Sequence, residues 1–233
     1  ADLVKQLVPN ANVNIISSTH PRGALQESPR LHPGGETNDI DIATASVIYR
    51  LPVQKYNLVA HIRTDSILAI SDFTSTERLF WQITDLKKLT QGLLLLQTYN
   101  PGSEVIRAAS GNNYLKFYKS ELAMRKALLY PPFALLVKLS LKGKLEDAVE
   151  QKAQKLFTEL NNLQLTINHS PFTILGPFKP SLSQKVPKYN IIIKMPLSSY
   201  SRKQREKTLN KLRPLLMAIP KEWQVEVEPD SLN

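Results

Sequence analysis

The sequence predicts a mixed chain, with an α/β segment, a helical connection and then an α+β segment. Three observations predict this division. Tyr130-Pro131-Pro132 interrupts a helical pattern, because a residue before proline avoids the α region and proline cannot continue the hydrogen-bond ladder. Before this break, short apolar strands alternate with connections, which is typical of a parallel sheet. After it, apolar segments follow the order β-α-β-β-α-β.

The first segment, residues 1–102, contains four predicted strands and one helix. The strands are expected at 13–16, 40–44, 58–62 and 93–98, and the helix at 76–89 with Leu79, Ile83 and Leu86 on one face. The stretch 17–38 is rich in proline, glycine and serine and predicts a loop. The strand at 93–98 is apolar enough to predict burial on both of its faces.

The connection, residues 103–133, is predicted to be helical. Leu115, Tyr118, Leu122 and Leu129 recur at helical spacing. Gly111-Asn112-Asn113 interrupts the pattern, so we expect two helices rather than one.

The last segment, residues 134–233, is a predicted basic C-terminal domain. Strands are expected at 134–141, 172–175, 189–195 and 223–228, and helices at 145–163 and 201–219. Pro214 should kink the second helix or begin a new turn. The order of elements is that of the split βαβ, ferredoxin-like arrangement.

Composition argues against several classes of protein. The chain has no cysteine and four scattered histidines, which excludes disulfides and argues against a structural zinc site. No apolar run approaches membrane-spanning length and no signal peptide is visible, so the expected location is the cytoplasm. If the chain binds DNA, association with the nucleoid is also expected. No cofactor is expected.

The positive charge is concentrated in the C-terminal half. The chain has 30 Lys+Arg and 20 Asp+Glu, a net charge of +10. Residues 1–102 hold 9 basic and 9 acidic residues, whereas 103–233 hold 21 and 11. Residues 179–213 hold ten basic residues and one acid, Glu206. This concentration suggests a polyanion partner, most simply nucleic acid; the alternative is a solubilising surface.

The candidate DNA-binding residues lie on the last helix and the loop before the preceding strand. Residues four apart share a helix face, so Lys203, Lys207 and Lys211 form a stripe that could follow phosphates. A solvated helix face is the alternative. Tyr189 could stack on a base or pack in the core. The full candidate set is Lys185, Lys188, Arg202, Lys203, Arg205, Lys207 and Lys211.

No catalytic motif is visible. The chain has no Walker-type glycine-rich lysine loop and no G-x-S-x-G sequence. Glu226 and Glu228 share one face of a predicted strand, where a solvated face is a commoner explanation than a catalytic pair.

Four sequence patterns resemble one known family. Phe117 to Phe133 follows F-Y-x-x-E-L-x-x-R-x-x-x-x-Y-P-P-F, which resembles the hinge before the C-terminal domain of the bacterial replication-restart helicase PriA (primosomal protein N′). Gln97-Thr98-Tyr99-Asn100-Pro101 resembles the Q-T-x-x-P of that family, and Leu175-Gly176-Pro177 its L-G-P turn. Residues 226–232 resemble its terminal D-x-D-P-x-S-L. Together the four patterns cover about the last 135 residues in the order of the family.

The resemblance implies that residues 1–102 are a degenerate second RecA-like helicase lobe. Phe73 with Glu77-Arg78 matches the D-F-x-x-x-E-R of the family. Its glycine-containing G-T-Q-M-x-x-K-G motif falls on 43–50, where no glycine remains. The two arginines of its Q-x-x-G-R-x-G-R motif fall on Leu86 and Leu89, and leucine cannot neutralise charge on a transferring phosphoryl group. We therefore expect no enzymatic activity; a helicase separated from its first lobe is a third interpretation.

The function that the resemblance implies is binding of branched or single-stranded DNA within a PriA-like primosome protein, without an ATPase of its own. The alternative is a protein-interaction module that docks single-stranded-DNA-binding protein or other primosome components. The arginine that holds the acidic tail of that protein in the family falls on Arg202. Its partner glutamine falls on Glu206, a departure that would repel an acidic tail.

Overall fold

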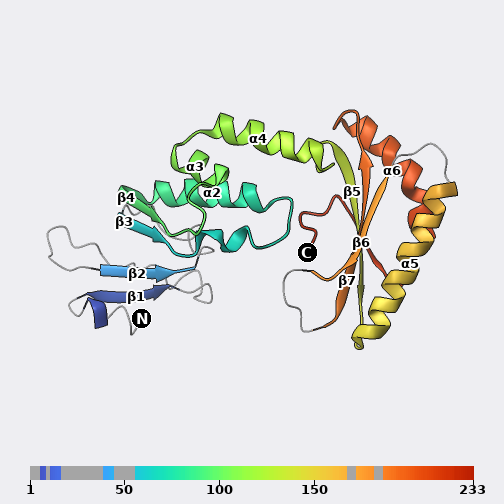
Figure 1. Ribbon diagram of the computed structural model, residues 1–233, viewed down its shortest axis with the longest axis horizontal. Helices are drawn as coiled ribbons and strands as arrows, with labels where there is room; N and C mark the ends of the chain where they lie inside the picture. Colours follow the sequence, from blue (N-terminus) through green and yellow to red (C-terminus); the bar gives the residue numbers. More distant parts are fainter. Residues whose placement is uncertain (1–5, 9–10, 17–38, 45–55, 167–171, 181–185) are drawn as a thin grey trace. The chain divides into compact units, whose positions relative to one another are not determined.

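The chain has the mixed α/β composition that the sequence predicts (Figure 1). The computed structural model describes residues 6–8, 11–16, 39–44, 56–166, 172–180 and 186–233. They group into two compact units, 1–61 with 84–95 and 62–83 with 96–233. This grouping assigns residues 62–83 to the same unit as the C-terminal part of the chain, whereas the sequence predicts a boundary near 102.

The described residues of the first unit form two small sheets. Strands β1 (Asn12–Ile16) and β2 (Asp39–Ala43) pair in parallel, and β3 (Tyr56–His61) pairs with β4 (Thr90–Leu96). The hydroxyl of Tyr56 donates a hydrogen bond to Oδ2 of Asp41 at 2.8 Å. The predicted loop at 17–38 lies outside the described residues, and so do positions 45–50 of the segment 43–50, on which the G-T-Q-M-x-x-K-G motif falls.

Strand β4 is more exposed than predicted. Leu93 and Leu95 are both largely exposed, so the prediction of burial on both faces is wrong. Among the described residues β4 pairs with one neighbour, β3, rather than lying inside a wide parallel sheet. Because side chains alternate along a strand, the leucines on its uncovered face meet solvent.

Among the described residues, a short 3-10 helix (Thr64–Ile67) and three α-helices lie between β3 and the large sheet in the sequence. The first α-helix, α2 (Ser75–Lys88), buries Leu79, Ile83 and Leu86 as predicted. The connection forms two helices, α3 (Glu104–Ser110) and α4 (Tyr114–Ala127), which confirms the predicted interruption. Asn113 caps α4, since its side chain accepts a hydrogen bond from the backbone N–H of Lys116 at 3.0 Å.

Helix α4 ends in a tight backbone turn just before the prolines. Leu129 has a left-handed conformation (φ 53°), a position that glycine usually occupies. The N–H of Tyr130 donates to the carbonyl of Arg125 at 2.8 Å, and the N–H of Leu129 donates to that of Lys126 at 3.4 Å. These bonds satisfy carbonyls that the end of the helix leaves open, so the predicted helix end is confirmed.

In the C-terminal part of the second unit, the residues that the structure describes form a four-stranded sheet and two helices. The strands are β5 (Ala134–Lys142), β6 (Thr173–Phe178), β7 (Lys188–Pro196) and β8 (Gln224–Val227). They lie in the order β6-β7-β5-β8, and every neighbouring pair is antiparallel. Helix α5 (Glu146–Thr166) follows β5, and α6 (Arg202–Met217) follows β7 and continues through Pro214.

Strand β6 carries the Leu175-Gly176-Pro177 turn noted in the sequence. Its pairing with β7 is irregular between Leu175 and Phe178. Gly176 has φ 118°, and a Cβ there would lie 2.7 Å from the carbonyl oxygen of Asn190. A side chain would therefore clash with β7 and strain the backbone, which explains the glycine.

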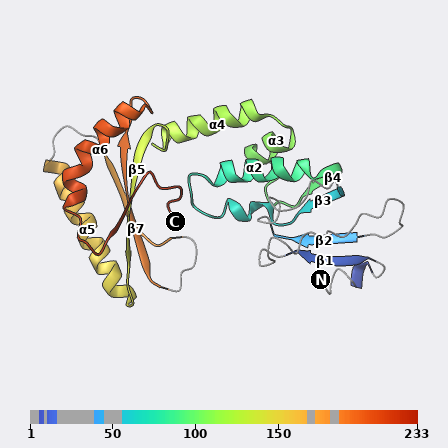
Figure 2. The same cartoon turned by 180° about the vertical axis from the view of Figure 1, so that it is seen from behind.

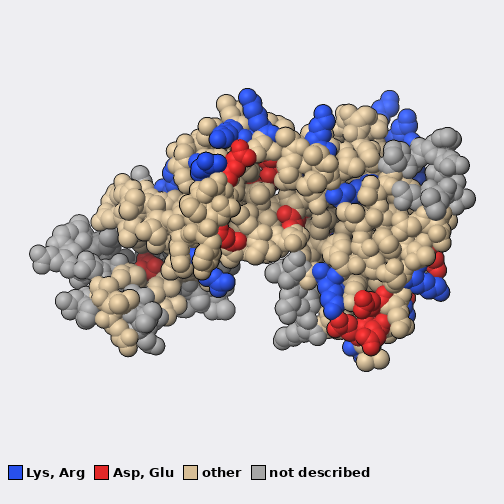
Figure 3. All heavy atoms as spheres, in the orientation of Figure 1, with Lys and Arg blue, Asp and Glu red and all other residues tan. Residues whose placement is uncertain are grey.

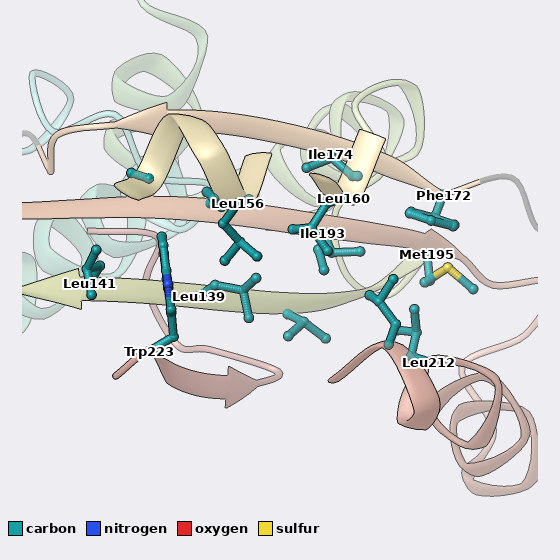
Figure 4. Close-up of a cluster of buried hydrophobic side chains, with 14 of the residues drawn as sticks. Leu139, Leu141, Leu156, Leu160, Phe172, Ile174, Ile193, Met195, Leu212 and Trp223 are labelled. Atoms are coloured by element: carbon teal, nitrogen blue, oxygen red, sulfur yellow. The ribbon is translucent and has the colours of Figure 1, made fainter. Parts of the chain in front are cut away.

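One face of this sheet carries the main core. Helices α5 and α6 both cover that face, as the two views in Figures 1 and 2 show. Alternate residues of β5 and β7, with α5, α6 and Trp223, fill the space (Figure 4). Tyr189 is buried in this cluster, so the core alternative predicted for it is the correct one.

The opposite face of the sheet is covered by other segments of the same unit. Leu136 and Ile192 pack there with Phe73 and Leu232. Polar side chains are buried beside them. Asn190 is fully buried; its amide donates to the carbonyl of Leu232 at 2.8 Å, and its Oδ1 accepts from the hydroxyl of Ser140 at 2.8 Å.

The patterns found far apart in the sequence meet within this unit. Arg125 lies 2.7 Å from Glu77 and 2.8 Å from Glu121, and the rings of Phe73 and Tyr130 stack with centroids 5.3 Å apart. Near the C-terminal residues, Asp72 accepts hydrogen bonds from the hydroxyl of Ser231 and from the N–H of Leu232. These motif residues therefore act as packing and pairing positions.

Candidate nucleic-acid interface

Helix α6 presents a row of lysines to solvent. Its inward face buries Thr208, Leu212 and Leu215 against the sheet. Lys203, Lys207 and Lys211 are all exposed, as expected from their four-residue spacing. Figure 3 shows Lys and Arg side chains gathered over the upper end of α6. We refer to these three lysines as the α6 stripe.

The first turn of α6 has an unusual charge. Ser201 caps the helix by accepting a hydrogen bond from the N–H of Gln204 at 3.3 Å, but the first turn contains no acidic residue. Positive side chains at a helix N-terminus oppose the helix dipole, at a cost of about 0.3–1 kcal/mol each when exposed. Arg202 and Lys203 stand at this end. A bound anion would relieve this repulsion, which makes the turn suited to a negatively charged partner.

Arg202 and Glu206, the residues predicted to contact a protein partner, pair with each other. Nε of Arg202 lies 2.8 Å from Oε1 of Glu206, one turn further along α6. The side chain of Arg202 is 88% exposed and that of Glu206 59%. Such an exposed pair stabilises the helix by only about 0.3–0.5 kcal/mol, so a partner could separate it at little cost.

Arg205 has a different environment from its neighbours. Its Nη1 donates to both carboxylate oxygens of Glu228 at 3.0 Å, and its guanidinium lies 4.8 Å from the centre of the Tyr200 ring. Hydrogen bonding to Glu228 raises the pKa of Arg205, while burial, followed by the hydrogen bond to Glu228, raises the pKa of Tyr200. Arg205 therefore joins α6 to the end of β8, which leaves fewer of its N–H groups for a phosphate.

Lys188 does not join the α6 stripe. Lys188 lies on β7 directly opposite Lys142 of β5. Two positions further along the same strands, the side chains of Ser140 and Asn190 form a hydrogen bond on the sheet face away from the helices. Because side chains alternate along a strand, Lys188 belongs to that face as well. Burial, with the charges of Lys138 and Lys142, lowers the pKa of Lys188. The predicted DNA-binding residues are therefore not on one surface: those of α6 lie on the helix-covered side of the sheet, and Lys188 lies on the other side. Lys185 lies outside the described residues.

The two glutamates considered as a catalytic pair, Glu226 and Glu228, each bind side chains of other elements of the fold. Glu226 lies 2.9 Å from Nζ of Lys138, and Glu228 binds Arg205 and Tyr200. Glu228 has φ 52°, so it leaves the strand alternation that the sequence suggested. Among the described residues no group of three or more His, Cys, Asp or Glu side chains could hold a metal ion.

Sequence reasoning missed the lysine crowding on the sheet and an aromatic cluster on α2 and α4. The pairing of Lys142 with Lys188 follows from strand register, which no local pattern specifies. For the aromatic cluster a signal existed: Tyr114 and Tyr118 are four residues apart on a helix.

No helix in the described part of the chain is long and apolar enough to cross a membrane.

Comparison with known proteins gives one consistent result. Residues 126–230 match the family model described as the primosomal protein N C-terminal domain. The chain is 28% identical over 219 residues to the replication restart protein PriA of Borreliella burgdorferi, which covers 90% of this chain and 32% of the relative. It is 26% identical over 201 residues to that of Thermotoga maritima, covering 84% and 25%, and 32% identical over 147 residues to that of Chlamydia muridarum, covering 60% and 20%. The chain thus spans about a third or less of the length of these curated relatives.

Proposed function

We propose that this chain, which contains the C-terminal region of the PriA family, is a DNA-binding part of a replication-restart protein and has no ATPase activity of its own. The relatives carry the name replication restart protein, and the family-model match lies in the basic part of the chain. The observation that carries the DNA-binding proposal is the α6 stripe, three exposed lysines with no acidic residue between them on that row.

The geometry of the stripe suits a nucleic-acid backbone. Four residues of α-helix rise about 6 Å, so the three ammonium groups form a row that can meet successive phosphates. Each phosphate neutralised releases counterions, so that affinity falls with salt by a slope of about 0.9 per contact on duplex DNA and about 0.7 on a single strand. The proposed ligand is branched or single-stranded DNA.

Two finer features of the fold belong to the same proposal. The order β6-β7-β5-β8, with helices on one face, supports a ferredoxin-like C-terminal domain. Leu86 is buried on the inward face of α2, which supports a packing role at a position where an active helicase would present an arginine. We therefore propose that the N-terminal segment is a degenerate helicase lobe.

The test measures fluorescence anisotropy of the whole chain with single-stranded, duplex and forked DNA across a salt series. A variant with Lys203, Lys207 and Lys211 changed to glutamine should bind more weakly, with a salt slope smaller by about 2–3. The matched control changes Lys144, Lys155 and Lys221 to glutamine, which removes the same charge from exposed positions outside the stripe. Equal losses in the two variants would contradict the assignment to α6.

The alternative is a docking module for single-stranded-DNA-binding protein or other primosome components. The observation that favours it is the 88% exposed Arg202, whose salt-bridge partner, Glu206, is also exposed. No DNA binding at any salt, together with capture of a labelled acidic C-terminal peptide of that protein that Arg202→Ala abolishes, would replace the DNA proposal with this one.

A further inference from the structure

We propose that Trp81, Tyr114 and Tyr118 form a stacking site for unpaired bases of single-stranded DNA. This inference rests on the proposed DNA-binding function and adds to it a second contact site, carried by α2 and α4 rather than by α6. All three residues belong to the second unit of the chain.

The three rings form a continuous exposed cluster. The centroids of Tyr114 and Tyr118 are 5.8 Å apart with 27° between the ring planes, and those of Trp81 and Tyr114 are 6.0 Å apart with 39°. Trp81 is 43% exposed and each tyrosine 46%. Nearly half of each side chain is therefore open to a flat partner, whereas large aromatic residues usually bury most of their surface.

Buried rings beneath the cluster hold it in place. Phe80 and Phe117 stack with centroids 4.2 Å apart and planes 11° apart, and both are buried. Phe80 also contacts Trp81 edge-to-face at 5.6 Å and Tyr114 at 6.0 Å. Trp81 and Tyr114 thus contact the buried pair through Phe80, and Tyr118 is joined to it through Tyr114. Rings that are already packed lose less conformational freedom when a ligand binds.

A basic row runs beside the aromatic row on α4. Residues four or seven apart share a side of a helix, so Tyr114 and Tyr118 form one row. Lys119 and Lys126 lie on the adjacent row, which begins with the apolar Leu115. Both lysines are exposed. Figure 3 shows Lys and Arg side chains along the outer side of α4. Aromatic faces beside a line of cations are the two components of sequence-tolerant single-strand binding sites.

The acidic residue of α4 does not offset this charge. Glu121 is turned toward α2, where it lies 2.8 Å from Nε of Arg125 and accepts a hydrogen bond from Thr76 at 2.8 Å. The other charged residues of α4, Lys116, Lys119, Arg125 and Lys126, are basic. The outer side of the helix therefore attracts an anion.

A single strand fits this surface better than a duplex does. Bases in a duplex are stacked on one another and offer no free face, whereas unpaired bases can lie on exposed rings while their phosphates meet the lysines. An acidic peptide could use the same charges, and the test includes it as an outcome.

The experiment uses the tryptophan fluorescence of the whole chain. The chain has two tryptophans, and Trp223 is buried at 6% exposure whereas Trp81 is open. The probes, at low salt, are an oligothymidine, an abasic strand of the same length, a blunt duplex and an acidic peptide. We expect the oligothymidine to quench the emission, the abasic strand to bind with little quenching, and the quenching to disappear in Trp81→Phe. Trp223→Phe, with its fold checked by circular dichroism, should retain it.

A second measurement separates stacking from general damage. Tyr118→Ala should weaken oligothymidine binding by about 5- to 150-fold, the range expected for the loss of one stacked base, and leave binding of the abasic strand nearly unchanged. Tyr99→Ala removes a more exposed ring outside the cluster and is the matched control, expected to change neither.

The outcomes distinguish this inference from the proposed function. Salt-dependent DNA binding that needs the α6 stripe, with no quenching of Trp81 and no loss in Tyr118→Ala, would overturn the stacking site and leave the proposed function standing. Equal quenching by abasic and base-carrying strands would also overturn the stacking site. No DNA binding at all would overturn both, and quenching by the acidic peptide alone would make the surface a protein site.

Discussion

The two faces of the four-stranded sheet bury different kinds of side chain. The face covered by α5 and α6 buries apolar side chains such as Leu139, Ile191 and Ile193. The opposite face buries Leu136 and Ile192 but also Lys138, Asn190 and Lys194, each less than a tenth exposed.

Each buried polar group on that second face has a specific partner. Nζ of Lys138 donates to the carbonyl of Ser231 at 2.6 Å and pairs with Glu226 at 2.9 Å. Nζ of Lys194 donates to the carbonyl of Leu128 at 2.8 Å. Apolar contacts are non-directional, whereas an unmet buried donor is costly. The helix-covered face therefore buries the larger apolar cluster, while the directional bonds of the other face specify which segments can cover it.

The largest expected effect comes from the helix-covered face. Ile193→Ala should lower the free energy of unfolding by about 2–5 kcal/mol, because it removes buried methylene groups and leaves a cavity in a fully buried site. Urea unfolding followed by circular dichroism measures the change. Val225→Ala on β8, a partly exposed position, is the control and should cost much less. Similar losses for the two variants would show that burial of Ile193 adds no more stability than the partly exposed Val225 does.

A smaller effect is expected on the opposite face. Asp72→Ala removes the acceptor of the Ser231 hydroxyl and of the Leu232 N–H, so we expect a loss of about 1–3 kcal/mol. Hydrogen exchange should show faster exchange at Leu232, with the amides of β7 retaining their protection. Ser231→Ala in the same background should add little, since both changes remove the same contact. Full additivity would mean that the two residues act independently.

The smallest effect is a gain in stability. Lys142→Gln removes a like charge opposite Lys188 and should stabilise the protein by about 0.2–1 kcal/mol at pH 7 and low salt. The pKa of Lys188 is lowered in the folded state, so its charged form is unfavourable below that pKa. The penalty disappears as the pH rises through the folded pKa toward the ordinary lysine value of about 10.4.

The gain from Lys142→Gln should therefore be clear at pH 7 and fade near pH 10, in urea titrations at both values. Lys144→Gln, a neighbouring exposed lysine outside the strand pair, supplies the control. A gain that persists unchanged at high pH or in high salt would assign the effect to packing instead of charge.

The sequence predicted those parts of the molecule whose signals are local. The apolar spacing in 145–163 predicted α5, Gly111-Asn112-Asn113 predicted the break between α3 and α4, and Tyr130-Pro131-Pro132 predicted the end of α4. Exposure of Leu93 and Leu95 could not be predicted, since it depends on how many strands pair beside β4.

For the candidate site, the same limit applies. Helical spacing predicted that Lys203, Lys207 and Lys211 share one face of a helix, and all three lie at exposed positions of α6. The capture of Arg205 by Glu228, 23 residues away, depends on where β8 ends, and the meeting of Lys188 with Lys142 depends on register. Contacts of this kind are set by tertiary structure, and no local pattern in the sequence encodes them.

The contact between Lys194 of β7 and the end of α4 affects which segment of the chain can be inherited as one piece. Lys194 donates to the carbonyl of Leu128, and its Nζ lies 3.6 Å from the centre of the Tyr130 ring, while burial lowers its pKa. A piece that began at Ala134 would leave this ammonium without its acceptor and would uncover Leu136 and Ile192. Gene fusions or recombination events that preserve the domain are therefore expected to carry the preceding helices with it, so that the evolutionary module is longer than the fold that the four strands define.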